Sequence, residues 1–297
     1  MAPPAIPAGF RDAILTWYDA TGRSLPFRAS RDPYAILVSE VMAQQTQIGR
    51  VAAAWQAWLE RFPTVDSLAS ATPAEVLRAW SGLGYNRRAI QLHRAARAIV
   101  ADHGGRVPDR VGVLERLPGI GPYTARAVAA IAFGQSVGAI DTNVRRVLGR
   151  TLAADGVEMS PRALQDLADA AVSPDRPAAW THALMDVGAA FCRPRSPRCE
   201  GCPARPWCRY ARAAARRAEP IPAPPRTRPR RPFPTTSRWL RGRIVERLAA
   251  ATDWMPMRDQ IGDHPAEAVA TALRALCRDG IVELDPDDQT LARLALA

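Results

Sequence analysis

The sequence predicts an all-α first domain, a basic linker and a small carboxy-terminal module that combines helices with a two-stranded hairpin. Apolar residues recur at three- and four-residue spacing through residues 10–171, and no stretch there alternates as a β-strand does. Residues 220–245 are rich in arginine and proline and contain no acidic residue. The last residues return to helical periodicity and then show two short apolar runs around a polar turn.

The helical segments expected in the first domain are separated by prolines and glycines. They cover residues 10–18, 34–43, 51–59, 74–79, 89–100, 125–133, 144–147 and 163–171. In the tail, helices are expected at 241–251, 257–261 and 265–278, with strands at 281–284 and 290–296. Helices followed by such a hairpin resemble the winged helix, which often binds DNA. The predicted boundaries are 9–215 for the first domain, 216–236 for the linker and 237–297 for the module.

The chain is strongly basic, and every one of its Lys-plus-Arg cations is an arginine. The 40 cations outnumber 29 acidic residues, which gives a net charge of +11, and the sequence contains no lysine. A surplus of guanidinium groups favours a polyanionic partner, with nucleic acid as the leading candidate. The absence of lysine removes the side-chain amine that Schiff-base chemistry requires.

The amino terminus, MAPPAIPA, lacks the charged and apolar regions of a secretory signal. No apolar run reaches the length that a bilayer crossing needs. With 47% hydrophobic and 23% charged residues, the composition is that of a globular protein. The expected location is the bacterial cytoplasm, in association with the nucleoid if the partner is DNA.

Four of the five cysteines lie close together, as Cys192, Cys199, Cys202 and Cys208, with the spacing C-x6-C-x2-C-x5-C. This clustering indicates one shared metal centre, because a disulfide framework spaces its cysteines to close longer loops. Four thiolates suit either tetrahedral zinc or an iron–sulfur cluster. The spacing favours iron–sulfur and leaves zinc open, since the common zinc ribbons pair two C-x2-C knuckles.

The segment LPGIGPYTA, residues 117–125, has the form of a hairpin between two helices. Gly119 and Gly121 allow a tight turn that leaves backbone N–H groups facing outward where the next helix begins. A helix N-terminus of this kind is a phosphate-binding site. Over its whole length the segment resembles the helix-hairpin-helix element of DNA repair proteins.

Two carboxylates are candidates for acid–base chemistry. Asp141 precedes a predicted helix, so it either caps that helix or faces a cleft near the hairpin. Glu40 lies in an apolar helical segment, so it either faces solvent or occupies a low-dielectric site that raises its pKa, as a general acid requires. The residues alone leave both alternatives open. Gln44 and Gln45 add neutral donors and acceptors suited to base edges.

Several segments occur together in one order: SEVMAQQTQ, GLGY, LPGIGPYTA, DTNVRRV, MDVGAAFC and the cysteine cluster. Through them, over about residues 10–210, the chain resembles the MutY-type adenine DNA glycosylases of the helix-hairpin-helix superfamily. The resemblance implies a six-helix barrel and a helical domain with a [4Fe-4S] cluster on the four cysteines. It implies a monofunctional enzyme that flips adenine out of double-stranded DNA and hydrolyses its glycosidic bond, where adenine is mispaired with 8-oxoguanine or guanine. We expect the protein to be a monomer.

The resemblance also assigns roles to individual residues. Glu40 corresponds to the glutamate that protonates the leaving adenine and activates water, and Asp141 to the aspartate that stabilises the positive sugar intermediate. Tyr123 and Asn143 support these two groups. The implied DNA-binding residues are Gln44, Gln45, Tyr85, Gly119 and Gly121, of which Gln45 and Tyr85 wedge into the duplex. The implied base-pocket residues are Phe27, Arg28 and Asp186.

The chain departs from the family pattern at three positions and in its tail. Phe27 replaces a tryptophan and Ala43 a leucine, which predicts a roomier base pocket, and Asn86 replaces a tyrosine. Larger family members carry a Nudix-like carboxy-terminal domain that recognises 8-oxoguanine, and the tail here predicts a short form without it. Adenine excision is therefore a firmer expectation than strict dependence on 8-oxoguanine.

Three alternatives differ in chemistry. An endonuclease III-like enzyme that acts on oxidised pyrimidines needs a lysine to cleave the strand, and the chain has none. A thymine or uracil mismatch glycosylase shares the tyrosine and aspartate, but Glu40 and the glutamines favour adenine. A non-catalytic iron–sulfur DNA-binding protein would have no use for both Glu40 and Asp141 in these segments.

Overall fold

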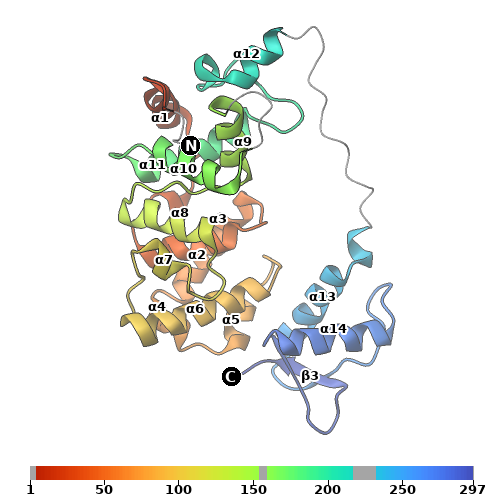
Figure 1. Ribbon diagram of the computed structural model, residues 1–297. Helices are drawn as coiled ribbons and strands as arrows, with labels where there is room; N and C mark the ends of the chain where they lie inside the picture. The colour runs from red at the N-terminus through yellow and green to blue at the C-terminus, as the bar shows by residue number, and fades with distance from the viewer. Residues whose placement is uncertain (1–4, 154–158, 217–231, 297) are drawn as a thin grey trace. The chain divides into compact units, whose positions relative to one another are not determined.

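A computed structural model describes residues 5–153, 159–216 and 232–296 and confirms a predominantly helical chain (Figure 1). The chain divides into two compact units. The first unit comprises Met1–Ile36, Asp109–Glu115 and Gly121–Arg226, and the second comprises Leu37–Pro108, Arg116–Ile120 and Thr227–Ala297. Most of the expected linker, at 217–231, lies outside the described residues, so its boundaries stay a prediction.

The first unit is built from helices. They are α1 (Phe10–Thr21), η1 (Pro26–Arg28), α7 (Val111–Leu114), α8 (Pro122–Phe133), α9 (Thr142–Thr151), α10 (Pro161–Ala171), α11 (Pro177–Ala190), η2 (Arg205–Trp207) and α12 (Arg209–Arg216). Helix α2 (Pro33–Ala43) contains the boundary between the units. The amphipathic segments expected at 10–18, 125–133 and 163–171 are confirmed as parts of α1, α8 and α10.

Helix α11 is the central helix of the first unit, and it packs against α1, α8 and α9. Trp180 of α11 meets Phe10 of α1 edge to face with 5.9 Å between ring centroids, and Trp207 meets the same phenylalanine at 5.8 Å. Sequence periodicity did not predict α11, because a helix that is buried on most sides carries apolar residues all round and shows no polar face.

The second unit combines helices with the carboxy-terminal module. Its elements are α3 (Ile48–Arg61), α4 (Val65–Ala69), α5 (Pro73–Ala79), α6 (Arg87–His103), η3 (Phe233–Thr235), α13 (Ser237–Ala249), β1 (Met255–Pro256), α14 (Ala266–Arg278), β2 (Val282–Leu284) and β3 (Leu291–Leu294). Trp58 centres its core, with ring centroids 5.0 Å from Phe62 and 5.5 Å from Trp80. Thr64 and Thr72 form capping boxes that start α4 and α5. None of the described helices has the length and apolar character that crossing a bilayer requires.

The module confirms two helices before an antiparallel hairpin, since α13 and α14 precede the pair β2 and β3. The expected helix at 257–261 is wrong. The preceding residues form β1, which pairs with β3 to make a three-stranded sheet of order β1-β3-β2. Pro256 and Gly262 flank this short segment and disfavour a helix there.

Gly188 allows α11 to approach α9 closely. A Cβ added at Gly188 would lie 2.4 Å from Cβ of Asn143, which is far inside contact distance. We expect Gly188→Ala to lower the free energy of unfolding in urea by about 1–3 kcal/mol, because the helices must separate. Gly149→Ala on α9 is the matched control, since no described atom beyond its own helix lies within 4 Å of the new Cβ. Equal stability of the two variants would contradict this packing role.

Candidate active site and metal centre

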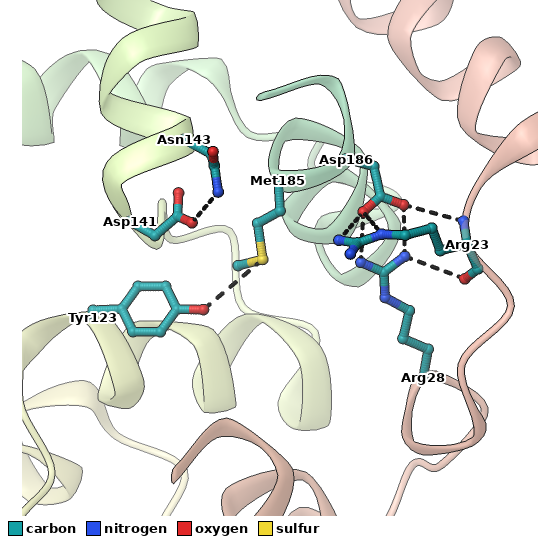
Figure 2. Close-up of polar contacts among 7 residues, drawn as sticks. All are labelled: Arg23, Arg28, Tyr123, Asp141, Asn143, Met185 and Asp186. Atoms are coloured by element: carbon teal, nitrogen blue, oxygen red, sulfur yellow. Dashed lines mark hydrogen bonds and ion pairs between the residues drawn. The ribbon is translucent and has the colours of Figure 1, made fainter. Parts of the chain in front are cut away.

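Asp141 caps helix α9 through its carboxylate. Its Oδ1 accepts a hydrogen bond from the backbone N–H of Val144 at 2.7 Å, and its Oδ2 accepts one from Nδ2 of Asn143 at 2.9 Å (Figure 2). The side chain is half-buried. The capping interpretation is therefore confirmed, and one bond on each oxygen fixes the orientation of the carboxylate.

Arg146 links Asn143 to the loop that carries the first cysteine. Its Nη2 donates to Oδ1 of Asn143 at 2.7 Å and to the carbonyl of Gly188 at 2.9 Å. Its Nε donates to the carbonyl of Cys192. A single guanidinium thus joins the amide beside Asp141 to the backbone of the cysteine loop. Sequence reasoning missed Arg146, because in a chain rich in arginine nothing marks the one that binds backbone carbonyls.

Met185 and Asp186 are neighbours on α11, and their side chains point to different partners. Tyr123, in the first turn of α8, is half-buried and places its hydroxyl 3.8 Å from Sδ of Met185. The next residue, Asp186, points toward Arg23 and Arg28 in Figure 2. Gly121 is the N-cap of α8 and turns the chain into that helix. The first unit therefore contains Asp141, Asn143 and Tyr123 together with the expected base-pocket residues.

Asp186 is the anion of a buried ion cluster. Arg28 binds it with two hydrogen bonds, from Nη1 to Oδ2 at 2.7 Å and from Nη2 to Oδ1 at 2.9 Å. Arg23 adds a bond from Nε to Oδ1 at 2.7 Å. The side chain of Asp186 is 3% exposed and that of Arg28 is 8% exposed. Burial would raise the pKa of Asp186, but the hydrogen bonds from the two arginines outweigh it and lower this pKa.

His182 lies one turn before Asp186 on α11 and is buried. Burial, reinforced by the positive charge of Arg28, lowers the pKa of His182 to about 3. The imidazole is therefore neutral at physiological pH. Phe27, which precedes Arg28 in η1, is also buried, so its aromatic ring adds to the apolar interior of this unit.

Glu40 is buried in the second unit, on helix α2, with 8% of its surface exposed. Its helix neighbours Ser39, Val41 and Met42 are buried as well. The solvent-facing alternative left open by the sequence is therefore wrong, and the glutamate occupies a low-dielectric site. The carboxyl group is thereby shielded from bulk water.

Two loops of the second unit have strained backbones at the expected wedge residues. Among the described residues, Gln45 (φ 55°) and Tyr85 (φ 50°) are the non-glycine residues with a left-handed backbone. Each such residue costs about 1–3 kcal/mol and persists where surrounding contacts enforce it. Gly119 also has a positive φ of 76° in the hairpin and packs against Gln91. Gln44 is half-buried, whereas Gln45 is exposed.

Arg88 of α6 holds both strained loops, and sequence reasoning missed it. Its Nη1 donates to the carbonyls of Val41 and Met42 at 2.9 and 3.0 Å and to that of Gln44. Its Nη2 donates to Oγ1 of Thr46 at 3.0 Å and to the carbonyl of Gly84 at 3.2 Å. The guanidinium also lies 5.3 Å from the ring centroid of Tyr85. Burial lowers the pKa of Arg88 to about 10, so the group stays charged at neutral pH.

The four clustered cysteines line one small cavity in the first unit, next to Arg150 and Tyr210. Arg150 donates from Nη1 to Sγ of Cys192 at 3.6 Å and holds the carbonyls of Arg193 and Pro194 at 2.8 and 2.9 Å. Sγ of Cys208 accepts from the N–H of Ala211 at 3.4 Å. These contacts keep the loop closed around the thiols.

Burial raises the pKa of the Cys202 thiol to about 11 and that of Cys199 and Cys208 above its usual range. Such thiols become thiolates when a bound metal supplies positive charge. Within the described ranges, no three His, Cys, Asp or Glu side chains converge closely enough to hold a single metal ion. The four thiols around one cavity are the donor set that a zinc ion or an iron–sulfur cluster takes.

Comparison with known proteins identifies related sequences over most of the chain. Residues 38–170 match the model of the HhH-GPD superfamily base excision DNA repair proteins. An adenine DNA glycosylase of Mycobacterium tuberculosis is 44% identical over 80% of this chain and 78% of its own length. One from Mycolicibacterium smegmatis is 42% identical over 96% of this chain and 94% of its own length. A solved thermostable thymine-DNA glycosylase superposes with a TM-score of 0.65 at 32% identity and covers 69% of this chain and 95% of that one.

Arg88→Met removes the donors from both wedge loops while it keeps an apolar side chain of similar reach. We expect the free energy of unfolding to fall by about 2–4 kcal/mol, because several backbone carbonyls lose charge-assisted hydrogen bonds. Urea titration measures this loss. Arg97→Met, at an exposed position of the same helix, is the control and should change stability by less than about 0.5 kcal/mol. Similar losses of unfolding free energy in both variants would show that Arg88 does not support the two loops.

His182 makes stability depend on pH. The unfolded chain binds a proton at His182 near pH 6.5, whereas the folded protein does not bind it until about pH 3. Stability therefore falls as pH falls from 6.5 toward 3, by up to about 1.4 kcal/mol per pH unit. We expect His182→Leu to lose this part of the slope in urea titrations between pH 7.5 and 5. Parallel stability profiles for the two proteins would show that His182 is not the group responsible.

Proposed function

This chain belongs to the adenine DNA glycosylase family of HhH-GPD base excision repair proteins, and we propose that it hydrolyses the N-glycosidic bond of adenine mispaired with 8-oxoguanine or guanine. The observation that carries the proposal is the burial of Glu40 within the matched segment. A buried carboxyl group can remain protonated long enough to act as an acid on a leaving purine. The same group then accepts a proton from the attacking water.

Asp141 is proposed to stabilise the positive charge that develops on the sugar as the bond breaks. Its carboxylate is held by the Val144 N–H and the Asn143 amide, so it needs no reorientation when the charge appears. Tyr123 and Asn143 are proposed to support the catalytic pair. This division between an acid and an anion follows the logic of glycoside hydrolysis, here applied to an N-glycosidic bond.

Base flipping is assigned to the second unit. Gln45 and Tyr85 are proposed to enter the duplex, and Arg88 keeps both in a conformation that they would not hold by themselves. Gln44 contacts base edges, while the hairpin with Gly119 and Gly121 offers backbone N–H groups to a phosphate. Phe27, Arg28 and Asp186 are proposed to line the base pocket.

Cys192, Cys199, Cys202 and Cys208 are proposed to hold a [4Fe-4S] cluster. The shared cavity and the Arg150 contacts support this assignment. The cluster would hold the cysteine loop in one conformation. The exposed Arg193, Arg195 and Arg198 would then present positive charge to the DNA backbone. We propose that the protein acts as a monomer on chromosomal DNA in the bacterial cytoplasm.

Thymine excision is the second candidate, because the solved structure at 32% identity is named a thymine-DNA glycosylase. Adenine is favoured since the adenine DNA glycosylases are the more similar sequences and cover more of the chain. Strand cleavage through a lysine Schiff base has no candidate side chain, because the sequence contains no lysine.

An excision assay tests the substrate. We expect the purified protein to release adenine from duplexes with A opposite 8-oxoguanine or G, so that the strand breaks only after alkali treatment. Duplexes with T opposite G or with oxidised thymine should remain intact. Release of thymine, or a strand break without alkali treatment, would contradict the proposed function.

Glu40→Gln should lower the single-turnover rate of adenine excision by at least about 100-fold, because the amide can neither donate a proton to adenine nor activate water. Binding of the mismatched duplex, measured by fluorescence anisotropy, should stay within about threefold of the wild-type value. Glu60→Gln removes an exposed carboxylate from the same unit and is the control. Excision by the Glu40 variant at the control rate would refute the assigned role.

A further inference from the structure

A groove of about 970 Å³ opens within the second unit, between the wedge loops and the carboxy-terminal module. One side is lined by Gln45, Tyr85 and Gly119, three residues expected to contact DNA. The other side is lined by Phe233 of η3 and by residues of α13 that include Arg238. The module therefore forms a wall of the groove in which the wedge residues lie.

Polar contacts hold the module in this place within the unit. Arg78 of α5 donates to the carbonyls of Ala249 and Ala251 at 3.2 and 3.0 Å. Asp279, the residue after α14, pairs with Arg87 of α6 at 3.8 Å and accepts from Arg94 of the same helix at its carbonyl, at 3.4 Å. These contacts anchor both helices of the module to α5 and α6.

Arg238 lies between two aromatic rings in the groove. Its guanidinium carbon is 5.0 Å from the ring centroid of Tyr85 and 4.9 Å from that of Phe233, and it donates a hydrogen bond to the Tyr85 hydroxyl. The Phe233 side chain is 52% exposed, although phenylalanine is usually buried. The three side chains form a short stack that begins at the wedge tyrosine and ends at an exposed apolar ring.

The groove carries an excess of positive charge, which Asp279 offsets in part by pairing with Arg87 and Arg241. Six arginines line it, and one acidic residue does: Arg50, Arg87, Arg88, Arg238, Arg241 and Arg243, with Glu246. Glu246 is itself paired with Arg243. A positive groove with aromatic and guanidinium faces has the chemistry that binds single-stranded nucleic acid, through backbone phosphates and stacked bases.

We propose that this groove binds the DNA strand opposite the target adenine, with its unpaired nucleotide stacked on Phe233 and hydrogen-bonded by Arg238. The inference rests on the proposed function, since adenine flipping is what leaves a nucleotide without a partner. A purely phosphate-binding surface would need arginines but no exposed ring. The exposed ring therefore favours a DNA strand that has an unpaired base, because such a base can stack on it. The module would thus take part in substrate binding.

Removal of the base opposite the adenine tests this position directly. Two labelled duplexes carry either guanine or an abasic site opposite A, and the full-length Glu40→Gln protein binds each of them without turnover. We expect the duplex with guanine to bind about tenfold more tightly in fluorescence anisotropy, because the abasic site has no base to stack on Phe233. Phe233→Ala and Arg238→Gln, each added to Glu40→Gln, should weaken binding of the guanine duplex by about tenfold and remove its advantage over the abasic duplex.

Arg247→Gln is the matched control, since it removes one arginine from an exposed position of α13 outside the groove lining. It should keep the preference for the guanine duplex and most of the affinity. An unchanged affinity and an unchanged preference in both groove variants would overturn the proposal. Tighter binding by Arg238→Gln would overturn it too, because it would mean that Arg238 shields Tyr85 from DNA.

The two proposals fail in different measurements. Excision of adenine by protein with intact Glu40 tests the reaction, and its absence leaves the affinities for the two duplexes interpretable. Conversely, excision with no change of these affinities in either groove variant would retain the enzyme and rule out the groove as a strand-binding site. Circular dichroism checks that the groove variants are folded, which is expected because Phe233 and Arg238 are exposed.

Discussion

Backbone carbonyls bound by half-buried arginines are the interactions on which the proposed chemistry depends. The C-terminal end of α2 leaves carbonyls without partners in the helix, and Arg88 supplies donors to those of Val41 and Met42. The same guanidinium reaches the Tyr85 loop at Gly84. One side chain therefore sets the end of the helix that carries Glu40 and the conformation of both expected wedge residues. A lysine has three donors on one nitrogen and lacks the planar fork that spans two loops.

The first unit uses the same device at the cysteine loop. Arg146 and Arg150 bind four carbonyls of that region, and Arg146 also holds the Asn143 amide. A loop with few regular hydrogen bonds of its own is thereby tied to α9, the helix that Asp141 caps. The fold therefore uses the multiple donors of guanidinium in both units.

Much of the fold could be predicted, because most helices have one polar face and therefore show periodicity. Helix α11 could not, since it is buried on most sides, and β1 could not, since two residues carry no pattern. The candidate catalytic residues came from the resemblance, and periodicity left the environment of Glu40 open until its burial was known. Arg88 and Arg146 had no signal, because their partners are backbone carbonyls, which every residue type provides. The contact between Arg238 and Tyr85 joins residues 153 positions apart, a distance that no local pattern bridges.

Asp141 shows why capping and chemistry need not be alternatives. An N-cap aspartate is held by N–H groups of the first turn, so its rotamer is fixed before any ligand arrives. A carboxylate whose orientation is already fixed needs no reorientation when positive charge develops on a sugar. The Asn143 bond leaves further lone pairs on each oxygen available to a ligand. The structural role thus prepares the orientation that the proposed catalytic role uses.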